Sequence, residues 1–310
     1  MPAPKKKARA TLYGYASAAG LALAISLAAP QSAPANEQLV GFGESMFFSF
    51  RQATKQIAPD FDIRIWASNL EKALVAYRKG EFKRAHTLFK AAADEGDVMA
   101  HWWLGRMYKL GQGVKKNEGK SFFHFRQAAL KFDGLEAPGP LMGAKLDSLV
   151  NVGQYYLQGI PAAKVRKQPK RAMHIFRTAA QFRHPGAQYG LGVMFYDGSG
   201  TAKRPRRAMK WLTLSAQKHF PLALAKLGDI YWERRKNPRN LLRAMMWYTL
   251  AQNAVTAETH PSILKRYSKM AKSVPETVLH DAHLMALRWS RKYPPPHHRI
   301  MQQPVGGTDE

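Results

Sequence analysis

Histidines and glycine pairs are the features of this sequence that could carry metal-binding or catalytic chemistry. His280 and His283 lie three residues apart in a predicted helix, but a metal ion needs further ligands, so a surface or packing role is favoured. His124 takes the place of a core aromatic residue, which favours packing. Gly111-x-Gly113 and Gly198-x-Gly200 resemble phosphate loops, but they follow predicted helices and no Lys-Ser/Thr comes after them. We therefore interpret both glycine pairs as turns.

Other signatures of catalysis are missing. Cysteine is absent, which excludes disulfides, thiolate nucleophiles and zinc sites built from cysteines. Neither Gly-x-Ser-x-Gly nor His-Glu-x-x-His occurs, and no pair of acids recurs at a spacing that suggests acid–base catalysis. We therefore predict that the protein is not an enzyme and uses neither a metal ion nor a cofactor. An unrecognised hydrolase is the less favoured alternative.

Basic residues are the strongest chemical signal. The chain has 48 Lys and Arg against 21 Asp and Glu, a formal charge of +27, which implies anionic partners. Many of these cations fall into four clusters, which we name the basic ridge: Lys115, Lys116 and Lys120; Lys164, Arg166, Lys167, Lys170 and Arg171; Lys203, Arg204, Arg206 and Arg207; and Arg234, Arg235, Lys236 and Arg239. A single cluster of this kind is usually a solvated loop, so the fold must decide what the set can do.

An internal repeat positions these clusters. Ala187-x3-Leu191-Gly192 recurs 36 residues later as Ala223-x3-Leu227-Gly228, and Ala208-x2-Trp211 recurs at the same distance as Ala244-x2-Trp247. Alanine and glycine at fixed points let two helices approach closely, while Leu, Tyr and Trp at helical spacing fill the seam between them. Each helix pair leaves an apolar face that only the next pair can cover. The pattern predicts an all-α, right-handed solenoid of helix pairs.

The solenoid is predicted to span residues 66–255. Its parts are a capping hairpin at 66–95, full units at 97–131, 148–184, 187–219 and 223–255, and a Gly- and Pro-rich insertion at 132–145 between the first two units. Two closing helices are expected at 256–293, the second opened by a capping box of Ser273 and Glu276. Residues 294–310 are predicted to be a disordered tail.

The first 35 residues have the pattern of a secretory signal peptide. A positive segment that includes Lys5 and Arg9 precedes an apolar run from Ala18 to Ala29, and Ala33-Pro34-Ala35 fits a cleavage site. We predict export to the periplasm with cleavage after Ala35, followed by an N-terminal extension at 36–65. An uncleaved anchor is the alternative, because the uncharged stretch is long enough to span a membrane. No later segment is apolar enough to do so.

Stacked helix pairs form a concave face lined by the first helix of each unit, and we predict that a partner binds there. The side chains expected on this face are Trp102, Arg106, Lys109, Gln154, Tyr189, Tyr196, Asp229 and Trp232. Aromatic and basic groups together are typical of a recognition surface. For Trp102, Tyr189 and Trp232 the alternative is packing between units.

The basic ridge occupies the same place in every unit, directly after the first helix. Stacking should therefore align its four clusters along one edge of the solenoid. We predict that this edge meets an acidic sensor domain, an acidic polysaccharide or anionic lipid headgroups. Basic clusters with aromatic residues also suit nucleic acid, but the predicted export argues against it.

The repeat motif Ala-x3-Leu-Gly-x2-Tyr-x2-Gly-x-Gly, followed by Ala-x2-Trp-x3-Ala-Ala, resembles the Sel1-like repeat, a relative of the tetratricopeptide repeat. The order of the hairpin at Gly80–Ala93, the insertion, Gly153–Pro161 and His184–Gly192 also resembles the ExoR family of periplasmic Sel1-repeat proteins. That resemblance implies negative regulation of exopolysaccharide production by binding and restraining the periplasmic domain of a sensor histidine kinase. The alternative is an envelope protein that binds acidic polysaccharide or another anionic surface through the basic ridge.

Overall fold

A computed structural model describes residues 68–135, 138–256 and 259–295. The predicted signal peptide, its cleavage site, the N-terminal extension at 36–65 and nearly all of the predicted tail at 294–310 lie outside these residues.

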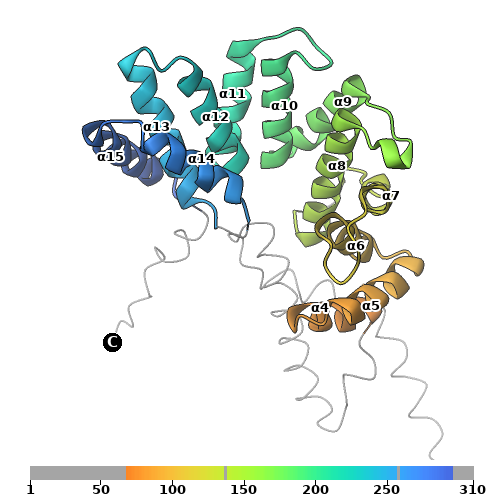
Figure 1. Cartoon of the computed structure of the whole chain (residues 1–310). Coiled ribbons are helices and arrows are strands. Elements are labelled where there is room, and N and C mark those ends of the chain that lie inside the picture. Colours follow the sequence, from red (N-terminus) through yellow and green to blue (C-terminus); the bar gives the residue numbers. More distant parts are fainter. Residues whose placement is uncertain (1–67, 136–137, 257–258, 296–310) are drawn as a thin grey trace, which may run out of the picture. The chain divides into compact units, whose positions relative to one another are not determined.

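Helices make up the described part of the chain, and no β-strand occurs in it apart from one isolated bridge between Ile160 and Val165 (Figure 1). The helices are α4 (Asn69–Arg78), α5 (Phe82–Asp94), α6 (Val98–Leu110), α7 (Glu118–Leu130), α8 (Pro140–Gln158), the short 3-10 helix η1 (Pro161–Ala163), α9 (Pro169–Gln181), α10 (Pro185–Asp197), α11 (Pro205–Ala216), α12 (Pro221–Glu233), α13 (Pro238–Asn253), α14 (Pro261–Ala271) and α15 (Glu276–Lys292). None of them is both long and apolar enough to cross a membrane.

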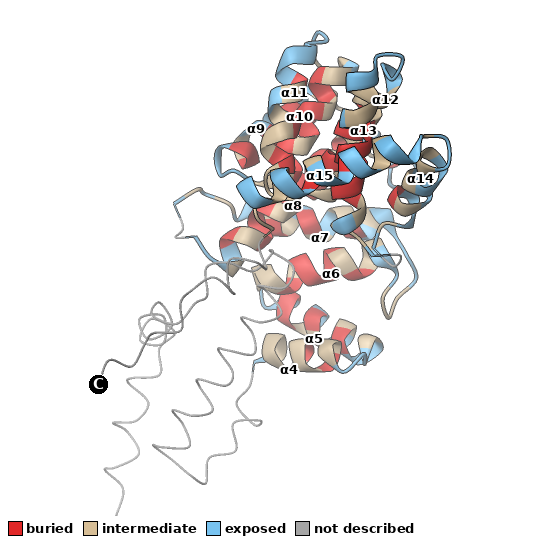
Figure 2. Ribbon diagram, turned by 90° about the vertical axis from the view of Figure 1, so that its left-hand side faces the viewer, coloured by how far each residue is buried: buried red, intermediate tan, exposed pale blue. Residues whose placement is uncertain are grey.

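The helices pack in chain order as hairpins. Four full units pair a first helix (α6, α8, α10 or α12) with a second helix (α7, α9, α11 or α13), and α4 and α5 form an earlier hairpin. Each second helix also packs against the next first helix, and α8 contacts both α6 and α10 directly. Buried residues lie where neighbouring helices face one another, as the red segments of Figure 2 show. The prediction of an all-α solenoid of helix pairs is confirmed.

One close approach recurs inside every full unit. The glycine of each Leu-Gly or Val-Gly pair lies against a bulky side chain of the second helix, so closely that a Cβ atom built on the glycine would meet that side chain below 3.0 Å. The pairs are Gly105 with Phe125 (2.8 Å), Gly153 with Phe176 (2.7 Å), Gly192 with Leu212 (2.6 Å) and Gly228 with Tyr248 (2.5 Å). Even a methyl group at these points would push the two helices apart.

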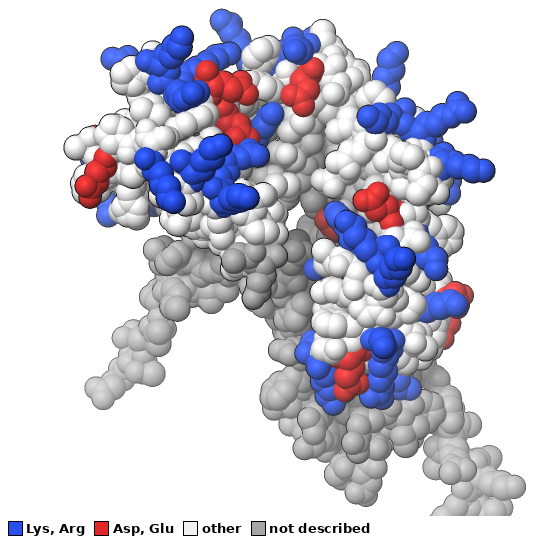
Figure 3. All heavy atoms as spheres, viewed as in Figure 1, with Lys and Arg blue, Asp and Glu red and all other residues white. Residues whose placement is uncertain are grey.

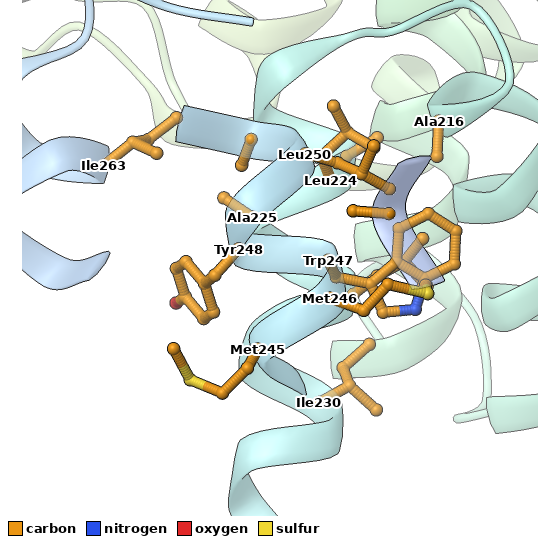
Figure 4. Packing of buried hydrophobic residues seen from close by; sticks show 14 of the residues in the cluster. Ala216, Leu224, Ala225, Ile230, Met245, Met246, Trp247, Tyr248, Leu250 and Ile263 are labelled. Carbon is orange, nitrogen blue, oxygen red and sulfur yellow. The ribbon is translucent and has the colours of Figure 1, made fainter. Parts of the chain in front are cut away.

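The last unit is closed by α14 and α15. Trp247 of α13 lies 5.4 Å from the ring of Trp289 on α15, and Ala282 and Ala286 of α15 are buried in the same cluster. Figure 4 shows the α13 side of this cluster, where Trp247, Met246 and Leu250 point into the space between helices. Because α15 covers this apolar face, the end of the stack needs no further repeat.

Two local predictions are wrong. The insertion is shorter than the predicted 132–145, because α8 begins at Pro140, where proline suits the first position of a helix. The capping box of Ser273 and Glu276 does not form: the Ser273 hydroxyl donates to the Met270 carbonyl at 2.8 Å and so closes α14 instead. Helix α15 begins at Glu276 without a side-chain cap.

Replacing Gly228 by alanine tests the close approach. Because the added methyl group would meet the ring of Tyr248 at 2.5 Å, we expect Gly228→Ala to lower the free energy of unfolding by about 1–3 kcal/mol. The matched control is Gly143→Ala in α8, where a Cβ atom meets nothing within 4 Å and the change should be neutral or slightly stabilising. Urea unfolding followed by circular dichroism measures both. Equal stability of the two variants would contradict the proposed constraint.

Candidate interaction surfaces

Trp102, predicted to face a partner, is buried. Only 1% of it is exposed, and its indole Nε1 donates to Asp147 Oδ2 of the next first helix at 2.7 Å. The prediction is wrong for this residue, because the direct contact between α6 and α8 covers the indole. Packing between units, the alternative considered for Trp102, is what the structure has.

Lys109 belongs to the same set of polar contacts between α6 and α8, which we name the first polar seam. Its Nζ donates to Asn151 Oδ1 at 2.6 Å, and the Asn151 amide donates to Asp147 Oδ2 at 3.2 Å. Burial lowers the pKa of Lys109, while Asp147 opposes this effect. Trp102, Asp147, Asn151 and Lys109 therefore form a connected network that fixes unit one against unit two, and Lys109 is less available to a partner than predicted.

A second polar seam joins units three and four. The Tyr196 hydroxyl donates to the carboxylate of Glu233, and Lys226 lies 4.6 Å from the centre of the Tyr196 ring and 3.9 Å from Asp197. Burial, together with the bond to Glu233, raises the pKa of Tyr196 to about 12, so this tyrosine remains a donor at physiological pH. The seam holds the Tyr196 ring in one place while leaving it partly exposed.

Asp229 is already occupied within the chain. Arg266 of α14 donates to Oδ1 at 2.8 Å and to Oδ2 at 2.6 Å, and the buried Tyr248 hydroxyl also donates to this carboxylate. Burial and the bond to Asp229 raise the pKa of Tyr248. The prediction that Asp229 is presented to a partner is therefore wrong, because Arg266 and Tyr248 occupy its carboxylate.

The remaining predicted residues stay partly exposed on the surface formed by α6, α8, α10 and α12, which we name the first-helix face. They are Arg106, Gln154, Tyr189, Tyr196 and Trp232. Arg106 lies 4.7 Å from the centre of the Trp102 ring, and Arg235 lies 4.9 Å from that of Trp232. Tyr189 contacts Phe220 at 5.6 Å between ring centres. The structure thus gathers three partly exposed aromatic rings on units three and four.

All of the basic ridge residues are exposed, and none of them forms an ion pair with a carboxylate of the described residues. The clusters follow α6, α8, α10 and α12 and lead into the second helices. Figure 3 shows Lys and Arg side chains projecting along the rim that carries these turns. The clusters therefore lie on the turns between the first and second helices and at the starts of the second helices.

Direct packing brings the first three turns of the ridge together. A Cβ atom on Gly113 would meet the backbone of Phe82 at 2.5 Å, and one on Gly200 would meet that of Pro169 at 2.9 Å. A Cβ atom on Gly119 would meet Ala163 of η1, also at 2.9 Å. Each turn therefore rests on the start of the second helix in the preceding unit, and the clusters are neighbours rather than isolated loops.

A recurring cation–tyrosine contact was not predicted. Lys120, Arg171 and Arg243 each lie just before the small residue of their second helix. They cover Tyr108 at 5.3 Å, Tyr156 at 4.5 Å and Tyr231 at 5.7 Å from the ring centres. All three tyrosines come three residues after the close-approach glycine, and this spacing was the available signal. The contact fixes the stems of ridge cations and adds Arg243 to the basic edge.

A cluster of histidines also went unpredicted. His101 Nδ1 lies 3.1 Å from His124 Nδ1, the His124 ring stacks on Tyr108 at 5.6 Å, and His86 Nε2 bonds to the Tyr108 hydroxyl at 3.0 Å. Burial, with His101, His86 and Lys120 adding to it, lowers the pKa of His124 to about 4. Burial also lowers the pKa values of His86 and His101. The three rings therefore pack as neutral groups near pH 7.

Metal ligands are not assembled in the part of the chain that the structure describes. No group of three His, Asp or Glu residues with ligand geometry occurs there. His280 and His283 are both exposed on α15.

Comparisons with known proteins identify the repeat. The family model described as "Sel1 repeat" matches residues 98–131, 146–181, 185–220 and 221–251. A crystal structure of a Sel1 repeat protein from Oxalobacter formigenes is similar in fold, with a TM-score of 0.51 and 22% identity, over 80% of this chain and 99% of that one.

Two curated relatives are named as regulators. Proteins named "Exopolysaccharide production negative regulator" from Rhizobium meliloti (strain 1021) and Rhizobium leguminosarum bv. viciae are 30% and 29% identical to this chain over 126 residues. Each match covers 40% of this chain and 46% of the relative, so the matched part is less than half of either regulator. An uncharacterized protein from Neisseria meningitidis serogroup B is 31% identical over 38% of this chain and 21% of its own length.

The partly buried His124 predicts a stability that depends on pH. Its pKa is about 6.5 in an unfolded chain and about 4 in the folded protein, so the unfolded chain takes up the proton first as the pH falls. The contribution of His124 to stability is complete above pH 6.5 and declines toward pH 4. We expect His124→Phe to keep the ring packing and to reduce the loss of stability between pH 7 and pH 5, measured by urea unfolding. His280→Gln, at an exposed site, should leave the pH dependence unchanged.

The ridge predicts a substitution that stabilises the fold. Lys170 occupies the second position of α9, which has no acidic residue in its first turn and no side-chain cap. A cation there opposes the helix dipole. We expect Lys170→Glu to raise the free energy of unfolding by up to about 1 kcal/mol, because an acid at this position is favoured by the dipole and by the cations around it. A lower melting temperature than that of the parent chain would contradict the conclusion that a cation at position 170 destabilises the fold.

Proposed function

We propose that the protein, whose residues 98–131, 146–181, 185–220 and 221–251 match the Sel1 repeat, binds and restrains a membrane sensor histidine kinase and so lowers exopolysaccharide production. The observation that carries this proposal is the match to two negative regulators of exopolysaccharide production. The chain is a repeat protein related to that regulatory family. The kinase, its restraint and the direction of the response are our proposals for this chain.

The periplasm is the compartment in which we propose that this binding takes place. A signal peptide cleaved after Ala35 would deliver the protein there, in reach of the periplasmic domain of a membrane kinase. The proposed activity is binding rather than catalysis.

The first-helix face of units three and four is the surface we propose for the kinase. Tyr189, Tyr196 and Trp232 are partly exposed there, and large aromatic side chains supply most of the binding energy in many interfaces. The Tyr196–Glu233 bond and the Arg235–Trp232 contact hold two of the three rings in place before a partner arrives. A surface that is already ordered loses less entropy on binding.

Exchanging Trp232 for alanine tests this surface. We expect Trp232→Ala to weaken binding to the purified periplasmic domain of the sensor kinase by at least about tenfold, measured by calorimetry, because a central aromatic contact is often worth about 2 kcal/mol or more. Trp211→Ala is the matched control: this tryptophan is also partly exposed but lies on α11, a second helix. It should bind like the parent chain, and melting curves should show that both variants fold.

The regulatory role is tested in the cell. We expect deletion of the gene to raise exopolysaccharide output, the Trp211→Ala variant to restore the original level and the Trp232→Ala variant to restore it poorly. Unchanged exopolysaccharide in the deletion strain would overturn the proposed function, whatever the purified proteins bind.

A further inference from the structure

Most of the basic ridge lies apart from the surface proposed for the kinase, and the two meet at Arg235, which covers the Trp232 ring. No acidic residue of the described chain forms an ion pair with the ridge. We propose that the ridge is a track that binds a linear acidic polysaccharide, with successive repeats contacting successive stretches of one polymer. The track runs over the turns after α6, α8, α10 and α12 and the starts of the second helices that follow them.

Continuity is the first argument for a track. The turn after α6 rests on the start of α5, η1 rests on the start of α7, and the turn after α10 rests on the start of α9. Since each of these three turns carries a ridge cluster, the first three clusters form a line with one step for each repeat. The fourth cluster occupies the same place in its own unit, after α12. A chain of regularly spaced negative charges can follow such a line, and its binding energy grows with each unit that it contacts.

The position of the charges is the second argument. Lys170 and Arg171 occupy the first turn of α9, and Arg206 and Arg207 occupy the first turn of α11. Helix starts favour acidic side chains and disfavour cations, and neither helix has an acid in its first turn or a side-chain cap. Arg171 covers the Tyr156 ring, but no contact within the described chain accounts for Lys170, Arg206 and Arg207 at these positions. An external anion would be attracted by both the side chains and the helix ends.

The turn between α8 and α9 shows how the track could hold a sugar acid. A recess of about 550 Å³ lies there, lined by Lys164, Arg166 and Lys167 together with the backbone at Gly159. The turn is braced by two backbone hydrogen bonds between Ile160 and Val165, at 2.8 and 3.1 Å, and the Ile160 side chain is buried. Lys164 has a left-handed backbone with φ of 54°. Three cations thus surround a shallow hollow on a braced support.

The composition of the ridge favours a polysaccharide over other polyanions. No large hydrophobic side chain is exposed on the turns at 159–168 and 198–204, whereas protein hot spots and membrane-bound surfaces use such side chains. Single-stranded nucleic acid needs open aromatic faces, but the Tyr108 and Tyr156 rings are covered by Lys120 and Arg171. Arginine and lysine suit carboxylates without either feature. The choice of a sugar polymer also uses the proposed export of the chain, and in that respect it rests on the proposed function.

Binding of the purified full chain to sodium polygalacturonate tests the proposal. We expect saturable binding that weakens at least tenfold between 50 and 300 mM NaCl, as contacts between exposed charges do, and much weaker binding of trigalacturonate, which is too short to span several units. Neutral dextran should not bind. Affinity that does not change with salt, or equal affinity for the trimer and the polymer, would overturn the track.

Two matched triple variants locate the site. The ridge variant combines Lys167→Gln, Lys170→Gln and Arg206→Gln. These three cations have no hydrogen bond, ion pair or ring contact within the described residues, so the fold should persist. We expect this variant to lose at least tenfold in affinity for polygalacturonate. The control variant combines Lys265→Gln and Lys269→Gln on α14 with Lys272→Gln directly after it. It removes the same charge elsewhere and should change affinity less than twofold. Equal losses would mean that net charge alone drives binding.

The competing polyanions are the remaining arms of the experiment. Tighter binding to phosphatidylglycerol vesicles, to poly-glutamate or to duplex DNA than to polygalacturonate at the same salt would overturn the choice of a polysaccharide. The ridge variant should still bind the kinase domain, and Trp232→Ala should still bind polygalacturonate. The two proposals can therefore fail independently.

Discussion

The contact between a glycine of the first helix and a bulky side chain of the second helix is the constraint on which the rest of this structure depends. It occurs once in each full unit, with Phe125, Phe176, Leu212 or Tyr248 as the bulky partner. Because the two helices meet at that point, the aromatic and aliphatic residues around it can fill the seam without cavities. The apolar face left over is then the same in every unit, so each unit accepts the next in one register and the stack needs no disulfide.

The fixed register between units determines which side chains are exposed on the first-helix face and on the basic ridge. First helices contact one another directly from α6 to α10, so the polar groups between them become ordered seams, such as Trp102–Asp147 and Lys109–Asn151. The turns to the second helices lie at the edge of the stack, where the ridge side chains are exposed to solvent. Polar residues on the first-helix face are therefore held by their neighbours, while most residues of the ridge have no polar partner within the described chain.

The sequence predicted those features that repeat. The spacing from Gly192 to Gly228 indicated the helix pairs and their boundaries, and the clusters after each first helix indicated the ridge. Contacts between different repeats, or between a repeat and the closing helices, could not be predicted from the repeat motif. The burial of Trp102 depends on Asp147, 45 residues away, and the occupation of Asp229 depends on Arg266, 37 residues away. A repeat motif indicates the role of a residue within its own unit. These two contacts depend instead on the side chains that lie on helices of other units. The insertion ended early for a local reason, the start of α8 at Pro140.

Acidic and basic residues are distributed differently between the seams of the first helices and the edge that carries the ridge. This contrast supports different functions for the two surfaces. Acidic residues of the repeat units are found chiefly on first helices, where Asp147, Asp229 and Glu233 each accept a hydrogen bond from a neighbouring element. Second helices carry cations instead, and in α9 and α11 these lie at the helix starts, where the dipole disfavours them. A fold selected only for stability would exchange the two sets. This arrangement of charges is the one that the proposed anionic partner of the edge would require.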